Sequence, residues 1–406
     1  MKNIKSYLTP KNLLVFNLIL VILFFLIGCE VDEGGNVFNP VDAIGSIVSP
    51  LPEYAPIPQN NAQSPEKILL GKQLYWDPIL SGNKDVACAT CHHPEKGYTD
   101  ALDLSIGVGG TGLGEQRVGT VLAKRNAHTV INTAFNGITV DNEVDPLASP
   151  MFWDNRAMSL EEQALGPPLS KEEMRGTEIP ENAMYDTIVN RLNAIPEYKL
   201  AFQNAFGTDE INTDRIAKAI ASFERTLIAN NSPFDRYMRG DESAMTQEQI
   251  NGMNAFVNVG CAECHNGPMF SDFQLHILSV PDNPKLPETD TGAGNYAFRT
   301  PTLRNLSFTA PYMHNGMHSS LQEVMEFYED IADGGGDGDD DGGDGGDINP
   351  NVSPNQIDPL ARQLQMDDDV TGAIIAFMEA LNDPNFDKTI PASVPSGLPV
   401  GGNIEN

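Results

Sequence analysis

The chain has 406 residues, with 25 Lys and Arg against 56 Asp and Glu, so its formal net charge is −31. This charge argues against nucleic acid as a partner, because binding a phosphate backbone requires clustered positive charge. Hydrophobic residues make up 40% of the chain and charged residues 20%, a balance typical of folded rather than disordered proteins. A chain of this length predicts about two or three domains.

The N-terminus has the pattern of an export signal. A basic start is followed by an apolar run at residues 13–27, which ends in LIGC and resembles a bacterial lipobox. We expect cleavage after a signal peptide of residues 1–28 and acylation of Cys29. The mature chain would then lie on the periplasmic side, held to the bacterial membrane by its lipid anchor only. An uncleaved anchor helix is the alternative, and it also exports the chain. Residues 29–63 are rich in Pro, Gly, Asn and Asp and predict a flexible tether.

Two identical cysteine motifs follow. Both have the spacing C-x-x-C-H, with thiols at Cys88, Cys91, Cys261 and Cys264 and imidazoles at His92 and His265. This is the attachment signature of c-type haem, because two thiols three residues apart can bond one haem's vinyl groups while the next residue places an imidazole under the iron. A thioredoxin-like pair, a zinc half-site and two disulfides are the alternatives. The repeated histidine and the export signal favour two covalently bound haems.

Helical patterns dominate the remaining chain. Apolar residues recur at helical spacing over residues 213–229, and the pairs Thr246 with Gln249 and Ser320 with Glu323 predict capping boxes at helix starts. Further helices are predicted at about 65–75, 159–165, 184–206 and 367–382, and no run shows convincing strand alternation. We therefore predict two mostly α-helical haem domains.

Residues 333–347 contain only Gly and Asp, with seven Asp. Such a segment cannot bury apolar surface and repels itself, which predicts a solvated insert. A calcium site built from closely spaced Asp is the alternative, although no acidic residue closes the pattern as in an EF-hand loop.

Several strings in order between Leu70 and Leu381 resemble the bacterial di-haem cytochrome c peroxidases and their MauG-like relatives. These strings are LGKQLYWDPILS, CATCHHPEKGYTD, RNAHTVINTAF, MFWDNRAMSLEEQALGPPLSKEEM, FERTLIANNSPFDRY, GCAECHNGPMFSD and TPTLRNLSFTAPYMHNG. The resemblance implies an all-α fold of two cytochrome c-like haem domains joined face to face, mostly helix and loop. It places a peroxide-reactive domain at residues 64–235, an electron-transfer domain at 236–385 and a C-terminal tail at 386–406.

The resemblance also implies a division of labour between the haems. His92 would be the proximal ligand of the peroxide-reactive haem and His265 that of the electron-transfer haem. Trp153 corresponds to the tryptophan between the haems, a plausible relay because an indole can be transiently oxidised. The alternative interpretation of Trp153 is a large core aromatic.

Two further sets of site residues rest on the resemblance. Gln163 and Glu173 match the distal-pocket pair, with Glu173 as the acid–base residue that shuttles a proton during O–O cleavage. A surface Glu on a capped helix is the alternative interpretation of Glu173. Asn126, Thr309 and Pro311 align with an interdomain calcium site, where oxygen donors suit a hard cation.

One departure concerns the peroxide-reactive haem. Classical members place a second, blocking His sixteen residues after the proximal His, and this position is Val108 here. Valine cannot ligate iron, so we expect the first haem to stay open to peroxide without reductive activation. His128 is a substitute ligand that we rank below its interpretation as a loop or surface histidine.

The second departure concerns the electron-transfer haem. Classical members place a distal Met fourteen residues after the position of His314, and this position is Tyr328 here, as in MauG-like members. A phenolate would stabilise ferric iron, whereas a thioether would raise the potential. We favour Tyr328 over Met325, one turn earlier on the same helix face, as the residue beside the iron.

Three functions remain open at this stage. The first is reduction of hydrogen peroxide to water, with electrons from a small cytochrome c or cupredoxin. The second is a MauG-like oxidation of Trp or Tyr residues on a partner protein. A plain electron carrier is the third, and Trp153, Gln163 and Glu173 argue against it because a carrier needs no proton-handling pocket. Family members are often homodimers, and the acidic chain is compatible with a basic donor protein.

Overall fold

A computed structural model describes residues 44–333, 348–366 and 368–405. The predicted signal peptide, the lipid site Cys29, the first part of the tether and residues 334–347 of the insert lie outside the described residues. Among the described residues, no helix is both long and apolar enough to cross a membrane. Residues Ser46–Asn406 form one compact unit, which contains both cysteine motifs.

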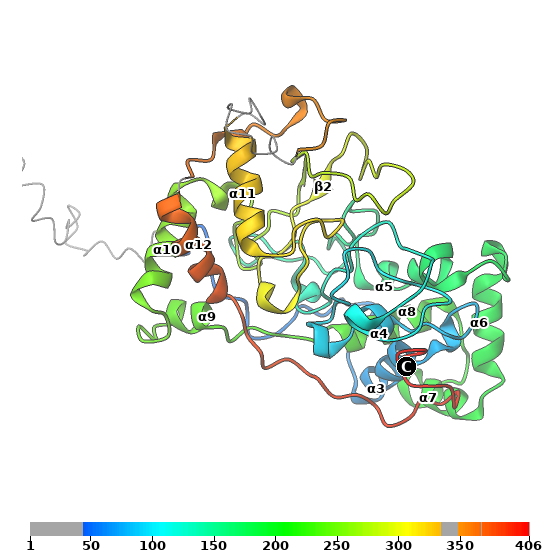
Figure 1. The fold of residues 1–406 in the computed structure, drawn as a ribbon. Coiled ribbons are helices and arrows are strands. Elements are labelled where there is room, and N and C mark those ends of the chain that lie inside the picture. Colours follow the sequence, from blue (N-terminus) through cyan, green and yellow to red (C-terminus); the bar gives the residue numbers. More distant parts are fainter. Residues whose placement is uncertain (1–43, 334–347, 367, 406) are drawn as a thin grey trace, which may run out of the picture. The chain divides into compact units, whose positions relative to one another are not determined.

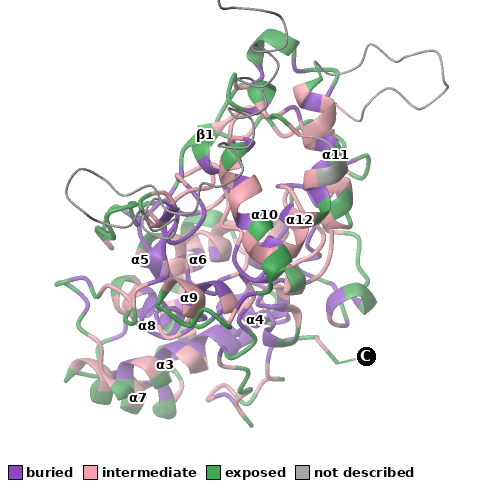
Figure 2. Ribbon diagram, turned by 90° about the vertical axis from the view of Figure 1, so that its left-hand side faces the viewer, coloured by how far each residue is buried: buried purple, intermediate pink, exposed green. Residues whose placement is uncertain are grey.

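The helices around the first cysteine motif pack mainly on α3 and α8. They are α3 (Pro65–Trp76), α4 (Cys88–Cys91), α5 (Leu160–Gln163), α6 (Met184–Asn193), α7 (Pro196–Phe206) and α8 (Thr213–Glu224). Ser64 caps α3 by accepting a hydrogen bond from the amide of Lys67 at 3.2 Å. Figure 2 shows buried residues gathered around α3, α4 and α8.

The helices around the second motif form another group (Figure 1). They are α9 (Pro233–Met238), α10 (Gln247–Asn258), α11 (Leu321–Ala332) and α12 (Asp368–Glu379), and α10 packs closely against α12. The capping box predicted from Thr246 and Gln249 is confirmed at the start of α10. Four phenylalanines, Phe234, Phe256, Phe270 and Phe377, pack edge to face in this group.

The two groups share one packing device that the sequence analysis did not find. A Cβ at Gly71 of α3 would lie 1.9 Å from the carbonyl oxygen of Ala219 in α8. A Cβ at Gly252 of α10 would lie 1.8 Å from the carbonyl oxygen of Ala373 in α12. In each pair only glycine permits this close approach of the two backbones. The helix before each cysteine motif, α3 or α10, therefore packs against a later helix, α8 or α12, through the same kind of glycine contact.

Most predicted helices are confirmed, with corrections at their ends. The predicted helix 184–206 is two helices, because Pro196 starts α7. The predicted box of Ser320 and Glu323 is only half formed: Ser320 caps α11, but the Glu323 carboxylate accepts from the amide and hydroxyl of Ser319. Helix α9 was not predicted.

Short turns and loops make up the rest of the described chain. The only strands in it are β1 (Leu275–His276) and β2 (Phe298–Arg299), an antiparallel pair with Leu275 opposite Arg299. The 3₁₀ turns are Pro78–Leu80, Pro94–Lys96, Gly114–Gln116, Thr133–Phe135, Pro167–Leu169, Glu181–Ala183, Cys261–Glu263, Leu306–Phe308, Pro354–Gln356 and Ala361–Gln363, and Lys171–Arg175 is a π turn.

The C-terminal segment after α12 returns to the first cysteine motif, as Figure 1 shows in red. Gly401 donates its amide to the carbonyl of Trp76 at 2.8 Å, and its carbonyl accepts the Thr90 hydroxyl at 2.7 Å. Phe386 and Val394 are buried against α3 and the chain near Tyr98. The predicted tail 386–406 is therefore, over its described residues, a packed strap.

Candidate functional site

A single cavity of about 590 Å³ contains both cysteine motifs in its wall. It also brings together most of the residues that the sequence analysis selected from distant parts of the chain. These are Cys88, Cys91, His92, Asn126, Trp153, Gln163, Glu173, Cys261, Cys264, His265, Thr309, Pro311, Met325 and Tyr328. The cavity is therefore the candidate active site.

Backbone contacts orient both motif histidines in the same way. Nδ1 of His92 lies 3.1 Å from the carbonyl oxygen of Tyr98, and Nδ1 of His265 lies 2.9 Å from that of Phe270. Such a contact fixes Nδ1 as the protonated nitrogen and leaves Nε2 as the ligand atom. Burial lowers the pKa of both imidazoles, which favours the neutral form that binds metal.

The motif cysteines are free thiols that share this environment. None of the four forms a disulfide, so the disulfide interpretation finds no support in the described chain. Burial raises the pKa of Cys88 and of Cys261 to about 12. The helical turn of each motif also brings the thiol pair close to its histidine, since the amides of His92 and His265 donate to the carbonyls of Cys88 and Cys261 at 2.9 Å.

The donor set fits two c-type haems. Each motif offers two thiols and one oriented imidazole, and side chains such as Val130, Met151, Leu160, Phe256 and Ile374 supply apolar walls. A neutral Nε2 in an apolar cavity suits iron in a porphyrin.

Trp153 contacts two histidine rings in the cavity wall. It is 8% exposed, and its indole N–H donates to the carbonyl oxygen of Asn126 at 3.1 Å. The ring of His128 lies 4.0 Å from the Trp153 ring, centroid to centroid, and that of His314 lies 6.3 Å away. These contacts hold the indole in one orientation.

Gln163 and Glu173 reach the same cavity from two short turns. Gln163 ends α5, which Ser159 caps, and Glu173 lies in the π turn Lys171–Arg175, where the Ser170 hydroxyl accepts the Glu173 amide at 3.3 Å. Burial raises the pKa of the Glu173 carboxyl, while Arg156 partly opposes this shift. Glu173 therefore retains its proton to a higher pH than an exposed Glu.

Val108 is buried in the apolar core that also contains Leu80, Val86 and Met174. Its loop is pressed against the turn that carries Glu173, since a Cβ at Gly107 would lie 1.8 Å from the carbonyl oxygen of Glu172.

His128 lies in a loop, as expected, but its ring faces the cavity and not the outer surface. His128 lines the cavity, stacks on Trp153 and places Nε2 at 3.2 Å from the Arg299 guanidinium. Burial, followed by the charge of Arg299, lowers the pKa of His128 well below its ordinary value, so the ring is neutral at pH 7.

Tyr328 and Met325 both project from α11 into the cavity wall near the second motif. Met325 is 4% exposed, and burial raises the pKa of the Tyr328 phenol. His314, from the preceding loop, stacks on Phe298 with ring centroids 3.6 Å apart.

The residues aligned with a calcium site are only partly in contact. The Asn126 side-chain amide donates to the carbonyl oxygens of Leu102 at 2.8 Å and Pro311 at 3.3 Å. Thr309 lines the same cavity, and its hydroxyl lies 3.4 Å from the Leu306 carbonyl oxygen.

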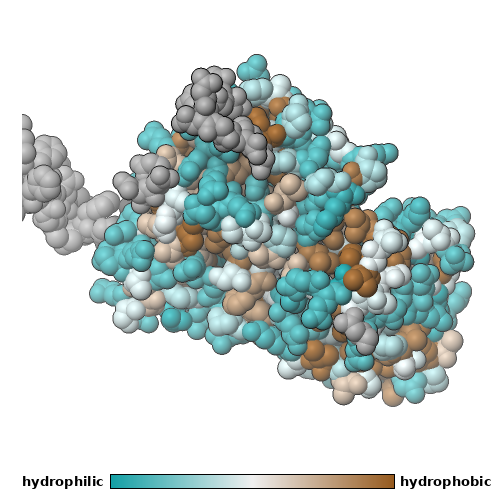
Figure 3. All heavy atoms as spheres, in the orientation of Figure 1, coloured by the Kyte–Doolittle hydropathy of each residue, from teal (hydrophilic) through white to brown (hydrophobic). Residues whose placement is uncertain are grey.

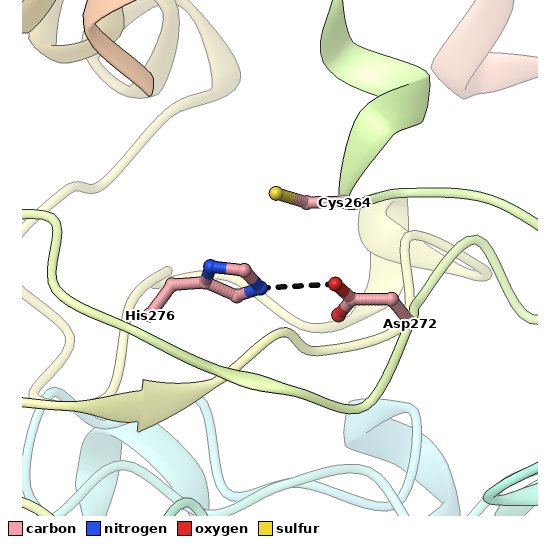
Figure 4. A group of neighbouring side chains, drawn as sticks. All are labelled: Cys264, Asp272 and His276. Carbon is pink, nitrogen blue, oxygen red and sulfur yellow. Dashed lines mark hydrogen bonds and ion pairs between the residues drawn. The ribbon is translucent and has the colours of Figure 1, made fainter. Parts of the chain in front are cut away.

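A carboxylate–imidazole group beside the second motif was missed by the sequence analysis (Figure 4). His276 contacts Asp272 through Nε2 at 2.9 Å and Asp358 through Nδ1 at 2.7 Å, and Cys264 lies close to this group. Asp272 and the neighbouring Cys264, followed by Asp358, raise the pKa of His276 to about 11, so the ring is a cation at pH 7. Asp358 is far from the motif in the sequence, and no local sequence pattern indicates that it contacts His276.

The cavity, with its two oriented motif histidines and its buried acid, can be set beside known proteins. A family model described as di-haem cytochrome c peroxidase matches residues 65–243. The methylamine utilization protein MauG of Methylorubrum extorquens is 37% identical over 284 residues, which cover 68% of this chain and 72% of that protein. The chain belongs to the di-haem cytochrome c peroxidase and MauG family.

Two further relatives agree with this membership. The cytochrome-c peroxidase IdrP1 of Pseudomonas sp. (strain SCT) is 35% identical over 319 residues, covering 70% of this chain and 76% of that protein. The crystal structure of a MauG-like protein associated with microbial copper homeostasis is 27% identical, with a TM-score of 0.64 over 82% of this chain and 95% of that one. As a family member, the chain is an oxidoreductase of the cytochrome-c peroxidase type with c-type haem cofactors.

Proposed function

We propose that the protein reduces hydrogen peroxide to two waters, with electrons delivered one at a time by a small cytochrome c or cupredoxin. The observation that supports this proposal is the common cavity, which holds two haem-attachment motifs, a fixed indole and a buried acid. The overall reaction consumes one peroxide, two electrons and two protons. When bound, the haems supply the redox chemistry, covalently attached through Cys88 and Cys91 in the N-terminal domain and Cys261 and Cys264 in the C-terminal domain.

The protein's own groups have distinct tasks in this proposal. His92 and His265 each present Nε2 to iron, held by the backbone contact at Nδ1. Glu173 holds the proton that the departing oxygen requires, because burial raises the pKa of its carboxyl. Gln163 orients peroxide by hydrogen bonding, and the surrounding apolar wall excludes water. Trp153 lies on the route of the electrons between the motifs.

Several finer assignments belong to the same proposal. Tyr328, rather than Met325, lies beside the second iron, and Asn126, Thr309 and Pro311 bind calcium. The haem domains span residues 64–235 and 236–385 and meet face to face. The chain is exported, anchored by a lipid on Cys29, and acts as a homodimer. A basic donor would suit its acidic surface, and Figure 3 shows hydrophilic side chains over most of one face.

The second candidate is a MauG-like oxidation of Trp or Tyr residues on a partner protein. Tyr328 on the cavity wall favours it, as does Val108, which is packed in the core and leaves the first haem without a blocking ligand from that position.

Steady-state turnover of the purified haem-loaded protein tests the proposal. Reduced cytochrome c and hydrogen peroxide are supplied without pre-reducing the enzyme, and donor oxidation is followed. Rapid turnover from the ferric state supports the peroxidase. Negligible turnover with several donors, together with peroxide-dependent oxidation of aromatic residues in a co-purified protein, would favour the second candidate.

A further inference from the structure

One buried acid in the cavity wall has no task in the mechanism above. Glu224 is the last residue of α8, is 4% exposed and lines the cavity near the first cysteine motif. Its Oε2 is fully buried and has no hydrogen-bond partner among the residues that the structure describes. An unpaired carboxyl group in such a place is costly in its charged form, which makes it unusual as a purely structural residue.

The neighbouring ion pair of Arg225 and Glu161 compensates the charge of Glu224 only in part. Arg225 is bound by Glu161, whose two carboxylate oxygens accept from the guanidinium at 2.7 and 2.8 Å. Asn61 also donates to Glu161 at 2.8 Å. Since Glu161 already balances the charge of Arg225, Glu224 is left without a counter-ion of its own.

The other groups that face Glu224 add no positive charge. They are Tyr75 on α3, Cys88 on α4 and Glu161 on α5. Burial raises the pKa of Glu224 to about 8, while Arg225 opposes this shift and Glu161 adds to it. The carboxyl is therefore mostly neutral at pH 7 and within reach of ionisation. Attachment of a haem at Cys88 would convert that thiol to an uncharged thioether and would add the haem iron, whose charge changes on reduction, to this part of the cavity.

We propose that Glu224 is a redox-linked proton site: it binds a proton when the N-terminal haem gains an electron and releases that proton when the electron leaves. This inference rests on the proposed attachment of a haem at Cys88. The balance is one electron from the donor protein and one proton from solvent for each reduction, both returned on oxidation. No bond other than the carboxyl O–H forms or breaks.

The physical basis is the low dielectric of the cavity wall. A unit charge on Glu224 interacts strongly with the charge at the haem, because little water screens the pair. An ionised carboxylate stabilises the oxidised haem and lowers its potential, and the neutral acid does not. The potential of this haem should therefore fall as the pH rises through the pKa of Glu224.

Spectroelectrochemical titration between pH 6 and 10 tests the proposal, with wild type compared with Glu224→Gln. In wild type, one of the two midpoint potentials should fall steadily as the pH rises above about 7. Glu224→Gln should abolish this fall with pH and leave the midpoint potential of the other haem unchanged. The matched control is Glu197→Gln, an exposed acid in the first turn of α7, which should behave as wild type. Equal slopes in wild type and Glu224→Gln would overturn the proposal.

A second measurement remains available if Glu224→Gln fails to fold. Oxidised-minus-reduced infrared spectra of wild type at pH 7 should show loss of a protonated carboxyl band on oxidation, and the absence of any carboxyl change would overturn the proposal. The covalent haem content of a denatured sample, measured first, distinguishes a failure of the proposed function from a failure of the role of Glu224. Protein without covalent haem contradicts the proposed function itself, whereas a loaded protein with unchanged slopes contradicts only the role of Glu224.

Discussion

Glu173 is the residue on which the proposed proton transfer depends. Its carboxyl lies in the cavity wall, where burial raises its pKa above that of an exposed Glu. Glu173→Gln keeps the size and removes the acid, so we expect peroxide turnover to fall by about 10²–10⁴-fold, the usual contribution of a general acid–base residue. Stopped-flow consumption of peroxide measures this loss. Glu178→Gln, an exposed acid after the same turn, should retain wild-type rates.

The two carboxylates around His276 make a pH-dependent contribution to stability. Because the folded state raises the pKa of His276 to about 11, this contribution is complete below the unfolded value of about 6.5 and is lost as the pH rises toward 11. Asp272→Asn removes one contact, so the free energy of unfolding should fall less steeply between pH 6.5 and 9.5 than in wild type. Urea titrations at several pH values measure the slope.

The control for this prediction is Asp141→Asn, at an exposed loop position. It should reproduce the wild-type slope. Identical slopes in wild type and Asp272→Asn would show that Asp272 does not sustain the charge on His276.

The residues of the site differ in how well the sequence predicted them. Cysteines and histidines of the motifs are adjacent in the chain, so spacing alone identifies them. Glu224, Arg299 and Asp358 reach the cavity or its margin only through tertiary packing, and nothing in their immediate sequence distinguishes them. The stacking of His128 on Trp153 was not predicted for the same reason, since it joins two loops that are separate in the sequence.

At the scale of elements, paired helices with a glycine contact support each cysteine motif. Gly252→Ala forces a methyl group against the carbonyl of Ala373, which should cost about 1–3 kcal/mol or more of stability. Gly372→Ala, in the partner helix α12, meets no atom within 4 Å and should be neutral or stabilising by up to about 1 kcal/mol. Thermal unfolding of both variants measures the contrast. Equal destabilisation would mean that close approach is not what selects glycine at position 252.

Helix α9 shows where pattern reasoning failed at this scale. The sequence analysis predicted no helix here, but Ser232 and Asp235 form a capping box and Pro233 occupies the first turn. Asp235 is also bound by the buried guanidinium of Arg304 through two contacts of 3.0 Å. A short helix fixed mainly by a distant arginine carries too little local periodicity to be predicted.

At the scale of the whole molecule, the C-terminal strap fastens the end of the chain to the first motif. Burying a side chain such as Phe386 or Val394 is worth about 1.5–3 kcal/mol each. Ending the chain after Asn385 should therefore lower the free energy of unfolding by several kcal/mol and expose the surroundings of Trp76. Denaturant titration of the truncated protein measures the loss. Ile390→Ala, at an exposed position of the same segment, serves as the control and should change the free energy of unfolding little.

The central claim is that one cavity couples two haem sites for peroxide reduction, and its most direct test is the stoichiometry of turnover. The ferric enzyme is given limiting hydrogen peroxide and excess reduced cytochrome c, and the donor oxidised per peroxide consumed is counted. The account predicts two donor molecules for each peroxide, without pre-reduction. Consumption of peroxide with no matching donor oxidation would contradict it.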